Sequence, residues 1–255
     1  MIYYFSGTGN SREVACQLAA ATRDSITDIT SPQAVIEENL LQIGFVFPVY
    51  AWGIPVVMKK FIQQMKIIRQ PDYVYMVCTC GDDIGQTDSE LAQLLRAKGL
   101  TLDAAWSVTM PNTYISLPGF DIDSTEVAER KIQETFKAIP AIAEKVRQQE
   151  RGIRNVTPGA FPFLKSRILR PLFLKFLSSD RLFHTTAACI KCSKCSKACP
   201  VNNITRTDDG RPQWNGQCTA CLSCYHHCPE NAIRYGHFSQ GKGQYTLETF
   251  LKKNH

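Results

Sequence analysis

Eight of the eleven cysteines in this chain stand in two short runs with identical spacing. The first run contains Cys189, Cys192, Cys195 and Cys199, and the second contains Cys218, Cys221, Cys224 and Cys228. Two, two and three residues separate the cysteines of each run, and a proline follows the last one in both. The second run repeats the first at a constant offset of 29 residues (Cys189 to Cys218, Cys199 to Cys228), which indicates an internal duplication.

Thiolates spaced this closely are suited to an iron–sulfur cluster. Three thiolates two residues apart can each bind a different iron on one face of a cubane, and the fourth thiolate must come from elsewhere in the chain. Pro200 and Pro229 fix φ after the last cysteine and help to turn that ligand away from its own loop. A disulfide framework is typical of short secreted chains, and zinc usually takes Cys-x2-Cys pairs that are well separated. The spacing therefore predicts two iron–sulfur clusters.

The two runs resemble the ligand pattern of bacterial two-cluster ferredoxins, in which the fourth cysteine of one run ligates the other cluster. The resemblance implies that one [4Fe-4S] cluster is held by Cys189, Cys192, Cys195 and Cys228. It implies that the second cluster is held by Cys218, Cys221, Cys224 and Cys199.

A second constellation follows the apolar run 1–5 and reads Ser6, Gly7, Thr8, Gly9, Asn10, Ser11. Hydroxyls and glycines between a strand and a helix N-terminus form an anion cradle, because free backbone N–H groups point at phosphate oxygens. No Gly-Lys-Ser/Thr follows, which excludes a Walker A loop. Arg12 stands where the dinucleotide fingerprint needs its third glycine.

This loop resembles the phosphate loop of flavodoxins, which implies bound FMN. In a doubly wound sheet, ligands bind at the carboxyl ends of the strands, where the loops 48–55 and 79–85 are also expected. We expect Tyr50 and Trp52 to offer ring faces to the isoalloxazine, although two aromatics that cap the sheet edge are the alternative. The predicted FMN contacts are Ser6, Gly7, Thr8, Gly9, Asn10, Ser11, Pro48, Tyr50, Ala51, Trp52, Gly53, Thr79, Cys80 and Gly81.

The elements that position these loops alternate between strand and helix patterns. Strands are expected at 1–5, 25–29, 43–47, 73–79 and 103–109, and helices at 55–68, 86–97 and 125–151. We predict an α/β flavodoxin-like doubly wound parallel sheet of five strands, order 2-1-3-4-5, with a small α+β ferredoxin domain. The predicted boundaries are 1–150 for the FMN-binding domain, 151–181 for a linker, 182–240 for the ferredoxin domain and 241–255 for a C-terminal tail.

The predicted linker is basic and amphipathic. Between 147 and 181 it carries eight basic residues against Glu150 and Asp180, interleaved with Phe, Leu and Ile up to Leu177. Such a segment can lie on an anionic membrane surface or contact an acidic redox partner protein. We favour a third arrangement, in which its apolar face packs on one or both domains and its charges are solvated.

Composition limits the remaining possibilities. The formal net charge is +6, but two ligated clusters would contribute about −4 and an FMN phosphate about −2, so the charge is no argument for nucleic-acid binding. No apolar run reaches the roughly 18 residues of a membrane span. The N-terminus reads as a strand without a basic region ahead of it, which favours a cytoplasmic protein over a secreted one.

The whole pattern is similar to the EFR1-type family of flavodoxin–ferredoxin fusions, and 48–55 and 110–114 also fit that family. The resemblance implies an electron-transfer protein that passes electrons between two [4Fe-4S] clusters and FMN. A flavin-dependent reductase of a small molecule or ferric chelate, and an iron–sulfur sensing module with an empty flavodoxin domain, are the alternatives. No acid–base pair or nucleophile stands out, so no catalytic residue is predicted.

Overall fold

The computed structural model describes residues 1–31, 41–176 and 178–254, so Leu177 of the predicted linker and His255 of the predicted tail lie outside it. The chain divides into two compact units. The first unit contains Met1–Ser6, Asn10–Pro111 and Glu126–Arg170, and the second contains Gly7–Gly9, Asn112–Thr125 and Pro171–His255. The predicted boundaries after residues 150, 181 and 240 remain a prediction.

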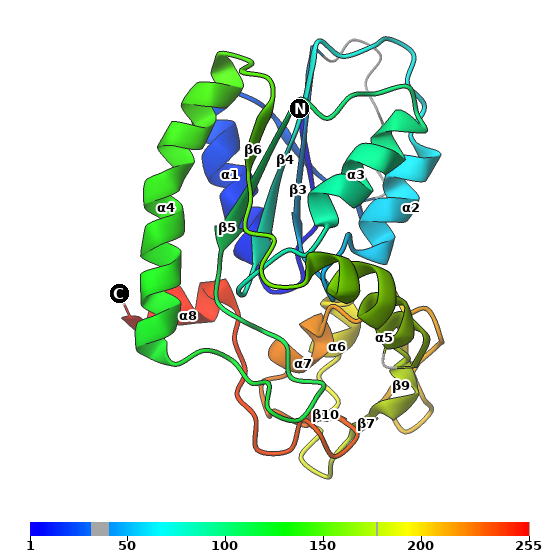
Figure 1. Ribbon diagram of the computed structural model, residues 1–255. Helices are drawn as coiled ribbons and strands as arrows, with labels where there is room; N and C mark the ends of the chain where they lie inside the picture. The colour runs from blue at the N-terminus through cyan, green and yellow to red at the C-terminus, as the bar shows by residue number, and fades with distance from the viewer. Residues whose placement is uncertain (32–40, 177, 255) are drawn as a thin grey trace. The chain divides into compact units, whose positions relative to one another are not determined.

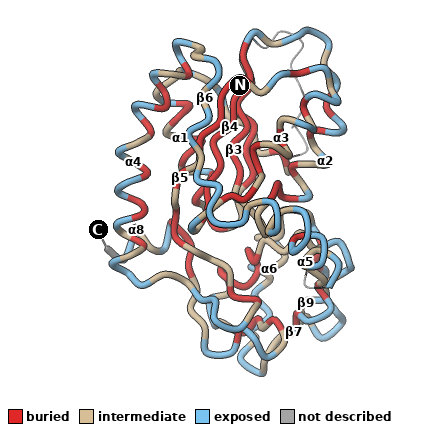
Figure 2. Tube along the Cα trace, in the orientation of Figure 1, coloured by how far each residue is buried: buried red, intermediate tan, exposed pale blue. Residues whose placement is uncertain are grey.

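The first unit is built around a parallel sheet with strand order β2-β1-β3-β4-β5-β6 (Figure 1). The strands are β1 Ile2–Tyr4, β2 Ile26–Asp28, β3 Gln42–Pro48, β4 Tyr73–Cys80, β5 Ala104–Thr109 and β6 Ile153–Asn155. All eight residues of β4 are buried, as expected for a central strand covered on both faces, and Figure 2 shows this buried interior. The parallel α/β class follows, and it is consistent with a flavodoxin-like fold.

The predicted number of five strands is wrong, because β6 adds a sixth strand beyond β5. β6 pairs with β5 in parallel, with Ile153 beside Ala104. Its three residues include one apolar side chain and lie at an edge where two of them are exposed, so no alternating pattern marks the strand. The predicted helix 125–151 is also shorter, since a turn through Gln149 (φ 50°) and Gly152 (φ 75°) leads into β6.

Helices cover both faces of the sheet: α1 Asn10–Thr22 and α4 Thr125–Arg147 on one side, α2 Val56–Gln64 and α3 Thr87–Arg96 on the other (Figure 1). Leu18 of α1 and Val146 of α4 share one core with Val77 and Trp106 of the sheet. Because the helices cover the two faces of the sheet, the loops that follow the strands are left at its carboxyl edge. A ligand site is expected there.

The second unit is small and combines short strands with short helices. Its strands form two antiparallel pairs: β7 Phe183–Thr185 with β10 Ile233–Tyr235, and β8 Ile204–Arg206 with β9 Pro212–Trp214. Its helices include α6 Lys194–Lys197, α7 Ser223–His226 and α8 Leu247–Asn254. Cys224 belongs to its core, and Cys195, Cys199, Cys218 and Cys228 pack against that core.

The sequence duplication is also a backbone duplication. Left-handed residues occur at Lys191 (φ 57°), Ser193 (φ 63°) and Asn202 (φ 51°) in the first run, and at Ala220 (φ 56°), Leu222 (φ 58°) and Asn231 (φ 43°) in the second. Each pair is separated by the same offset as the cysteines. The two loops therefore follow one path, with α6 and α7 beginning at equivalent positions.

The stretch 161–170, which belongs to the first unit, contacts the rest of that unit through its polar side chains, around the π-helix η1 Leu164–Leu169. Lys165 forms an ion pair with Asp83, and buried Arg170 binds Glu90 through Nη1 at 2.7 Å. Phe161 and Phe163 are 74% and 62% exposed. The prediction that the apolar face packs and the charges are solvated is wrong over this stretch, because half-buried carboxylates need cationic partners.

The π-helical turn itself helps this arrangement. The Arg170 backbone N–H donates to the Lys165 carbonyl, five residues back, so both cationic side chains project from the same side. In the part of the chain that the structure describes, no helix is long and apolar enough to cross a membrane.

Candidate functional site

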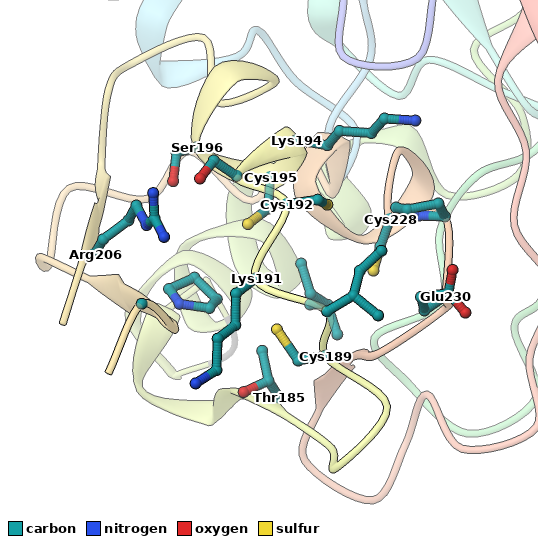
Figure 3. A pocket seen from close by; sticks show the side chains of 16 residues that line it. Thr185, Cys189, Lys191, Cys192, Lys194, Cys195, Ser196, Arg206, Cys228 and Glu230 are labelled. Atoms are coloured by element: carbon teal, nitrogen blue, oxygen red, sulfur yellow. The ribbon is translucent and has the colours of Figure 1, made fainter. Parts of the chain in front are cut away.

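The first pocket in the second unit is lined by Cys189, Cys192 and Cys195 of the first run together with Cys228 of the second. Figure 3 shows the four sulfur atoms around a common space. The left-handed residues at 191 and 193 curl the first run so that its three thiols point inward. Its fourth cysteine, Cys199, does not line this pocket.

The second pocket is lined by Cys218, Cys221 and Cys224 together with Cys199. Apolar side chains, among them Phe183, Leu222 and Trp214, complete its wall. The two quartets have the same members as the two ligand sets that the resemblance to two-cluster ferredoxins implies.

Burial raises the pKa of several of these thiols. Burial is the main cause that raises the pKa of Cys218 to about 12, and Cys221 and Cys199 add smaller repulsions. Burial likewise raises the pKa of Cys195, with Cys228 of the other run contributing in the same direction. Such thiols become thiolates only when a cationic group neutralises them, which a coordinated metal does outright.

Backbone N–H groups already point at sulfur. The Asn203 N–H donates to Cys199 Sγ and the Ala232 N–H to Cys228 Sγ, both at 3.2 Å and at equivalent positions of the repeat. The Ala220 N–H donates to Cys218 Sγ at 3.3 Å. N–H donors of this kind stabilise thiolate charge and tune the potential of an iron–sulfur cluster.

A [4Fe-4S] cluster and a zinc ion make different demands on four thiols. Among the described residues, no three His, Cys, Asp or Glu side chains form a group that could hold a metal ion. A zinc ion needs four sulfurs about 2.3 Å from one point, whereas a cubane spreads its thiolates over different irons. Each quartet supplies four thiols to one pocket, which is the number of cysteine ligands that a [4Fe-4S] cluster takes.

His226, which lies between two cysteines of the second run, forms hydrogen bonds with backbone groups and does not line the second pocket. Its Nδ1 accepts from the Tyr245 N–H at 3.2 Å, so its Nε2 donates to the Thr113 carbonyl at 2.8 Å. Burial is the main cause that lowers the pKa of His226 to about 4, which keeps the ring neutral. This histidine holds 112–125 and the C-terminal segment to α7.

The predicted flavin loops of the first unit follow β1, β3 and β4, which are neighbours in the sheet. Ser11 Oγ and Thr79 Oγ1 lie 2.8 Å apart and buried, which joins the first loop to the third. The Val49 N–H donates to the Thr79 carbonyl at 2.8 Å, which joins the second loop to the third. Asn10 Nδ2 donates to the Pro111 carbonyl at 3.1 Å. The structure thus gathers these loops at one sheet edge.

The loop after β3 is a tight turn in which Tyr50 and Gly53 exchange backbone hydrogen bonds of 3.0 and 3.2 Å. Ala51 and Trp52 are left-handed, with φ 46° and 58°, which is uncommon for residues with side chains. Tyr50 meets Phe5 edge to face, with ring centroids 6.1 Å apart. Pro48 ends β3 ahead of this turn.

Three residues of the predicted linker, Lys165, Ser166 and Arg170, contact this loop, and sequence reasoning missed them. Ser166 Oγ donates to the Trp52 carbonyl at 2.8 Å, and Lys165 Nζ lies 5.6 Å from the centroid of the Trp52 ring. A Cβ on Gly53 would overlap the Arg170 guanidinium, which Glu90 and the Ile54 carbonyl hold in place. Gly53 is therefore needed for this guanidinium, whatever its role toward a flavin.

In the loop after β4, the carboxylates of Asp82 and Asp83 and the thiol of Cys80 all have partners within the protein. Asp83 is paired with Lys165, and Asp82 lies 3.8 Å from Lys131, so neither carboxylate opposes an anionic flavin as an isolated charge. Cys80 donates through Sγ to the Val108 carbonyl at 3.8 Å, and burial raises its pKa to about 12. Its thiol is used within the sheet, and the backbone of 79–81 is what remains for a ligand.

The glycine-rich part of the first loop, Gly7–Gly9, belongs to the second unit. The Leu247 N–H, at the start of α8, donates to the Thr8 carbonyl at 2.9 Å. Gly9 has a φ of 99°, and a Cβ on it would stand 3.3 Å from the Leu247 Cβ. The α8 N-terminus therefore fixes the direction of the Thr8 carbonyl, and a larger residue than glycine at position 9 would be strained.

Residues 188–233 match the protein family described as 4Fe-4S dicluster domain. The match contains both cysteine runs, and it supports iron–sulfur binding by this part of the chain. No curated protein matches the sequence.

Solved structures similar to this chain include several oxidoreductases. An NAD(P)H:quinone oxidoreductase from Methanothermobacter marburgensis is 10% identical, with 55% of this chain and 94% of that chain covered and a TM-score of 0.36. The Trp repressor binding protein from Bacillus subtilis is 16% identical, with 55% and 96% covered and a TM-score of 0.39. An FMN-dependent NADH-azoreductase from Bacillus anthracis is 10% identical, with 56% and 98% covered and a TM-score of 0.35. At these scores the likeness carries no functional argument.

Proposed function

We propose that this chain is an electron-transfer protein that binds two [4Fe-4S] clusters in its second unit and an FMN at the carboxyl edge of its parallel sheet. The observation that carries the proposal is the grouping of the eight run cysteines into two quartets, each with three members from one run and one from the other. Iron–sulfur clusters exchange single electrons and a flavin exchanges one or two, so such a chain can convert between the two modes.

The chain's own residues have defined tasks in this proposal. Cys189, Cys192, Cys195 and Cys228 bind one cluster, and Cys218, Cys221, Cys224 and Cys199 bind the other. The N–H groups of Asn203 and Ala232 donate to the two exchanged cysteines and stabilise their charge. Apolar residues around the second quartet exclude water from it. A thiolate buried there is costly when it is alone, and the cationic core of a cluster would compensate its charge.

For the flavin, the proposal assigns phosphate binding to the backbone N–H groups and hydroxyls of Ser6–Ser11. Ser11 can keep its O–H for a ligand if Thr79 Oγ1 donates to it, since a hydroxyl both donates and accepts. The backbone of 48–53 and 79–81 lines the ring end. Because Lys165 neutralises Asp83, these loops permit an anionic ligand nearby.

Purification without oxygen, followed by absorbance, iron, sulfide and flavin analysis, tests the function. We expect broad charge-transfer absorbance, acid-labile sulfide, and release of FMN on denaturation. Protein that carries clusters but no FMN after incubation with the flavin would reduce the function to that of an iron–sulfur protein.

A further inference from the structure

The surface around the first quartet is basic and has an apolar centre. We call it the lysine surface and define it by Ile190, Lys191, Cys192, Lys194 and Lys197. All three lysines and Cys192 are exposed, and Ile190 is 60% exposed. Figure 3 shows Lys191 and Lys194 at the pocket that Cys189, Cys192, Cys195 and Cys228 line. The first quartet thus reaches the protein surface through an exposed cysteine.

The second run provides an internal comparison, because its backbone repeats that of the first. The positions equivalent to the three lysines are occupied by Ala220, Ser223 and His226. Ser223 and His226 are 3% and 5% exposed, and Cys224 is buried. The same loop with the same left-handed positions therefore forms without any lysine. The three lysines are not required by the fold of the loop.

Charges on neighbouring elements leave the surface positive. Arg206 also lines the pocket, and Glu230 is the acidic residue that lines it. Asp209, on the β8–β9 turn, has its pKa lowered chiefly by a hydrogen bond from Thr207, with a smaller contribution from Lys191. Lys191, Lys194, Lys197 and Arg206 outnumber Glu230 and the two aspartates of that turn, Asp208 and Asp209, so the side-chain charge around the exposed cysteine is positive.

We propose that the lysine surface binds a small acidic one-electron carrier protein that exchanges electrons with the cluster of the first quartet. The inference rests on the proposed function, since it needs that cluster. One electron leaves the reduced centre of the carrier and enters the cluster, and no bond or proton moves. Lysines around an exposed centre steer an acidic partner and accelerate encounter. An exposed isoleucine within a polar rim is the common pattern of an interface centre.

The test measures the second-order rate constant for reduction of the holoprotein, without oxygen, by a reduced plant-type [2Fe-2S] ferredoxin of strongly negative net charge. The variant replaces Lys191→Ala, Lys194→Ser and Lys197→Ser, which introduces the residues of the second run at the first two positions and a small neutral residue at the third. The control removes the same charge elsewhere with Lys175→Ala, Lys252→Ala and Lys253→Ala, since these lysines are also exposed.

At an ionic strength near 0.01 M, where screening is weak, we expect the rate constant of the variant to fall about tenfold or more. The control should stay within about twofold of the unaltered protein. Added salt should slow the unaltered protein steeply until it approaches the variant. Equal rate constants in variant and control would overturn the proposal. The proposal would also be overturned if a small neutral reductant reduced the variant as slowly, relative to the unaltered protein, as the ferredoxin does. The lysines would then act on the cluster itself and not on the binding of a partner.

Iron content and reduction by dithionite separate this inference from the function on which it rests. If the unaltered protein holds no clusters, the proposed function fails. If it holds clusters that dithionite reduces, while the ferredoxin reduces variant and control alike, only the docking proposal fails. Ile190→Ser should lower the rate constant and keep its salt dependence, because that change removes apolar contact and no charge.

Discussion

Cys228 lines the same pocket as Cys195, although the two residues belong to different cysteine runs. The reciprocal exchange places Cys199 beside Cys218, Cys221 and Cys224. Each run is therefore tied to the other through one residue that immediately precedes a proline. If both quartets bind clusters, the small second unit is cross-linked twice by metal.

Double substitutions test the exchange of ligands. With exchanged ligands, Cys189→Ser combined with Cys228→Ser removes two ligands from one cluster, so iron should fall from about eight to about four per chain. Cys189→Ser combined with Cys199→Ser affects both clusters, and iron should fall toward zero. Iron and sulfide analysis after anaerobic purification measures both. The opposite order, with more iron in the Cys189/Cys199 variant, would show that each run supplies its own four ligands.

The partly buried ion pair between Arg170 and Glu90 should hold 161–170 to the rest of the first unit. Arg170→Ala removes the shorter ion pair of the half-buried Glu90 and leaves it the Ile54 N–H and Lys59, 3.7 Å away, so we expect a loss of about 2 kcal/mol in the free energy of unfolding. Urea unfolding measures the loss. Arg147→Ala, which removes an exposed pair with Glu144, is the matched control and should cost less than about 1 kcal/mol. Equal effects in the two variants would contradict the structural role of Arg170.

Cys78 and Cys80 should resist alkylation. Burial raises the pKa of Cys80 to about 12 and that of Cys78 well above its ordinary value. At pH 8 roughly one Cys80 in ten thousand is a thiolate, and the thiolate is the reactive form. Mass spectrometry after iodoacetamide treatment of the holoprotein should find both unmodified while the half-exposed Cys16 is modified. Rapid modification of Cys80 at pH 8 would show that its thiol does not lie within the sheet.

The phosphate loop should be needed for FMN and not for iron. Thr8→Ala with Ser11→Ala removes two buried hydroxyls from the loop, so we expect the affinity for FMN to fall about tenfold or more. Fluorescence titration with FMN measures the affinity, and iron content should stay unchanged. Ser25→Ala, a change on the strand-side turn after α1, serves as the control. Unaltered FMN affinity in the double variant would contradict the assignment of the loop.

The regular parts of the fold were predictable because their patterns are local. The apolar run at Tyr73 predicts a strand of the sheet, and the 29-residue repeat predicts an internal duplication, which the structure shows as equivalent left-handed residues at Lys191 and Ala220. What sequence reasoning missed depends on contacts between distant residues. Lys165 meets Asp83 and Arg170 meets Glu90 only after the chain has folded, and neither pair has a signature of spacing. The edge strand β6 was missed because three residues with one apolar side chain carry no period.

Metal and sulfide analysis of anaerobically purified protein tests the central claim most directly. Two clusters in the two quartets predict about eight iron and about eight acid-labile sulfide per chain. One bound FMN per chain should accompany them if the sheet edge is the flavin site. Zinc in place of iron, or thiols free of metal after reconstitution with iron and sulfide, would contradict the account.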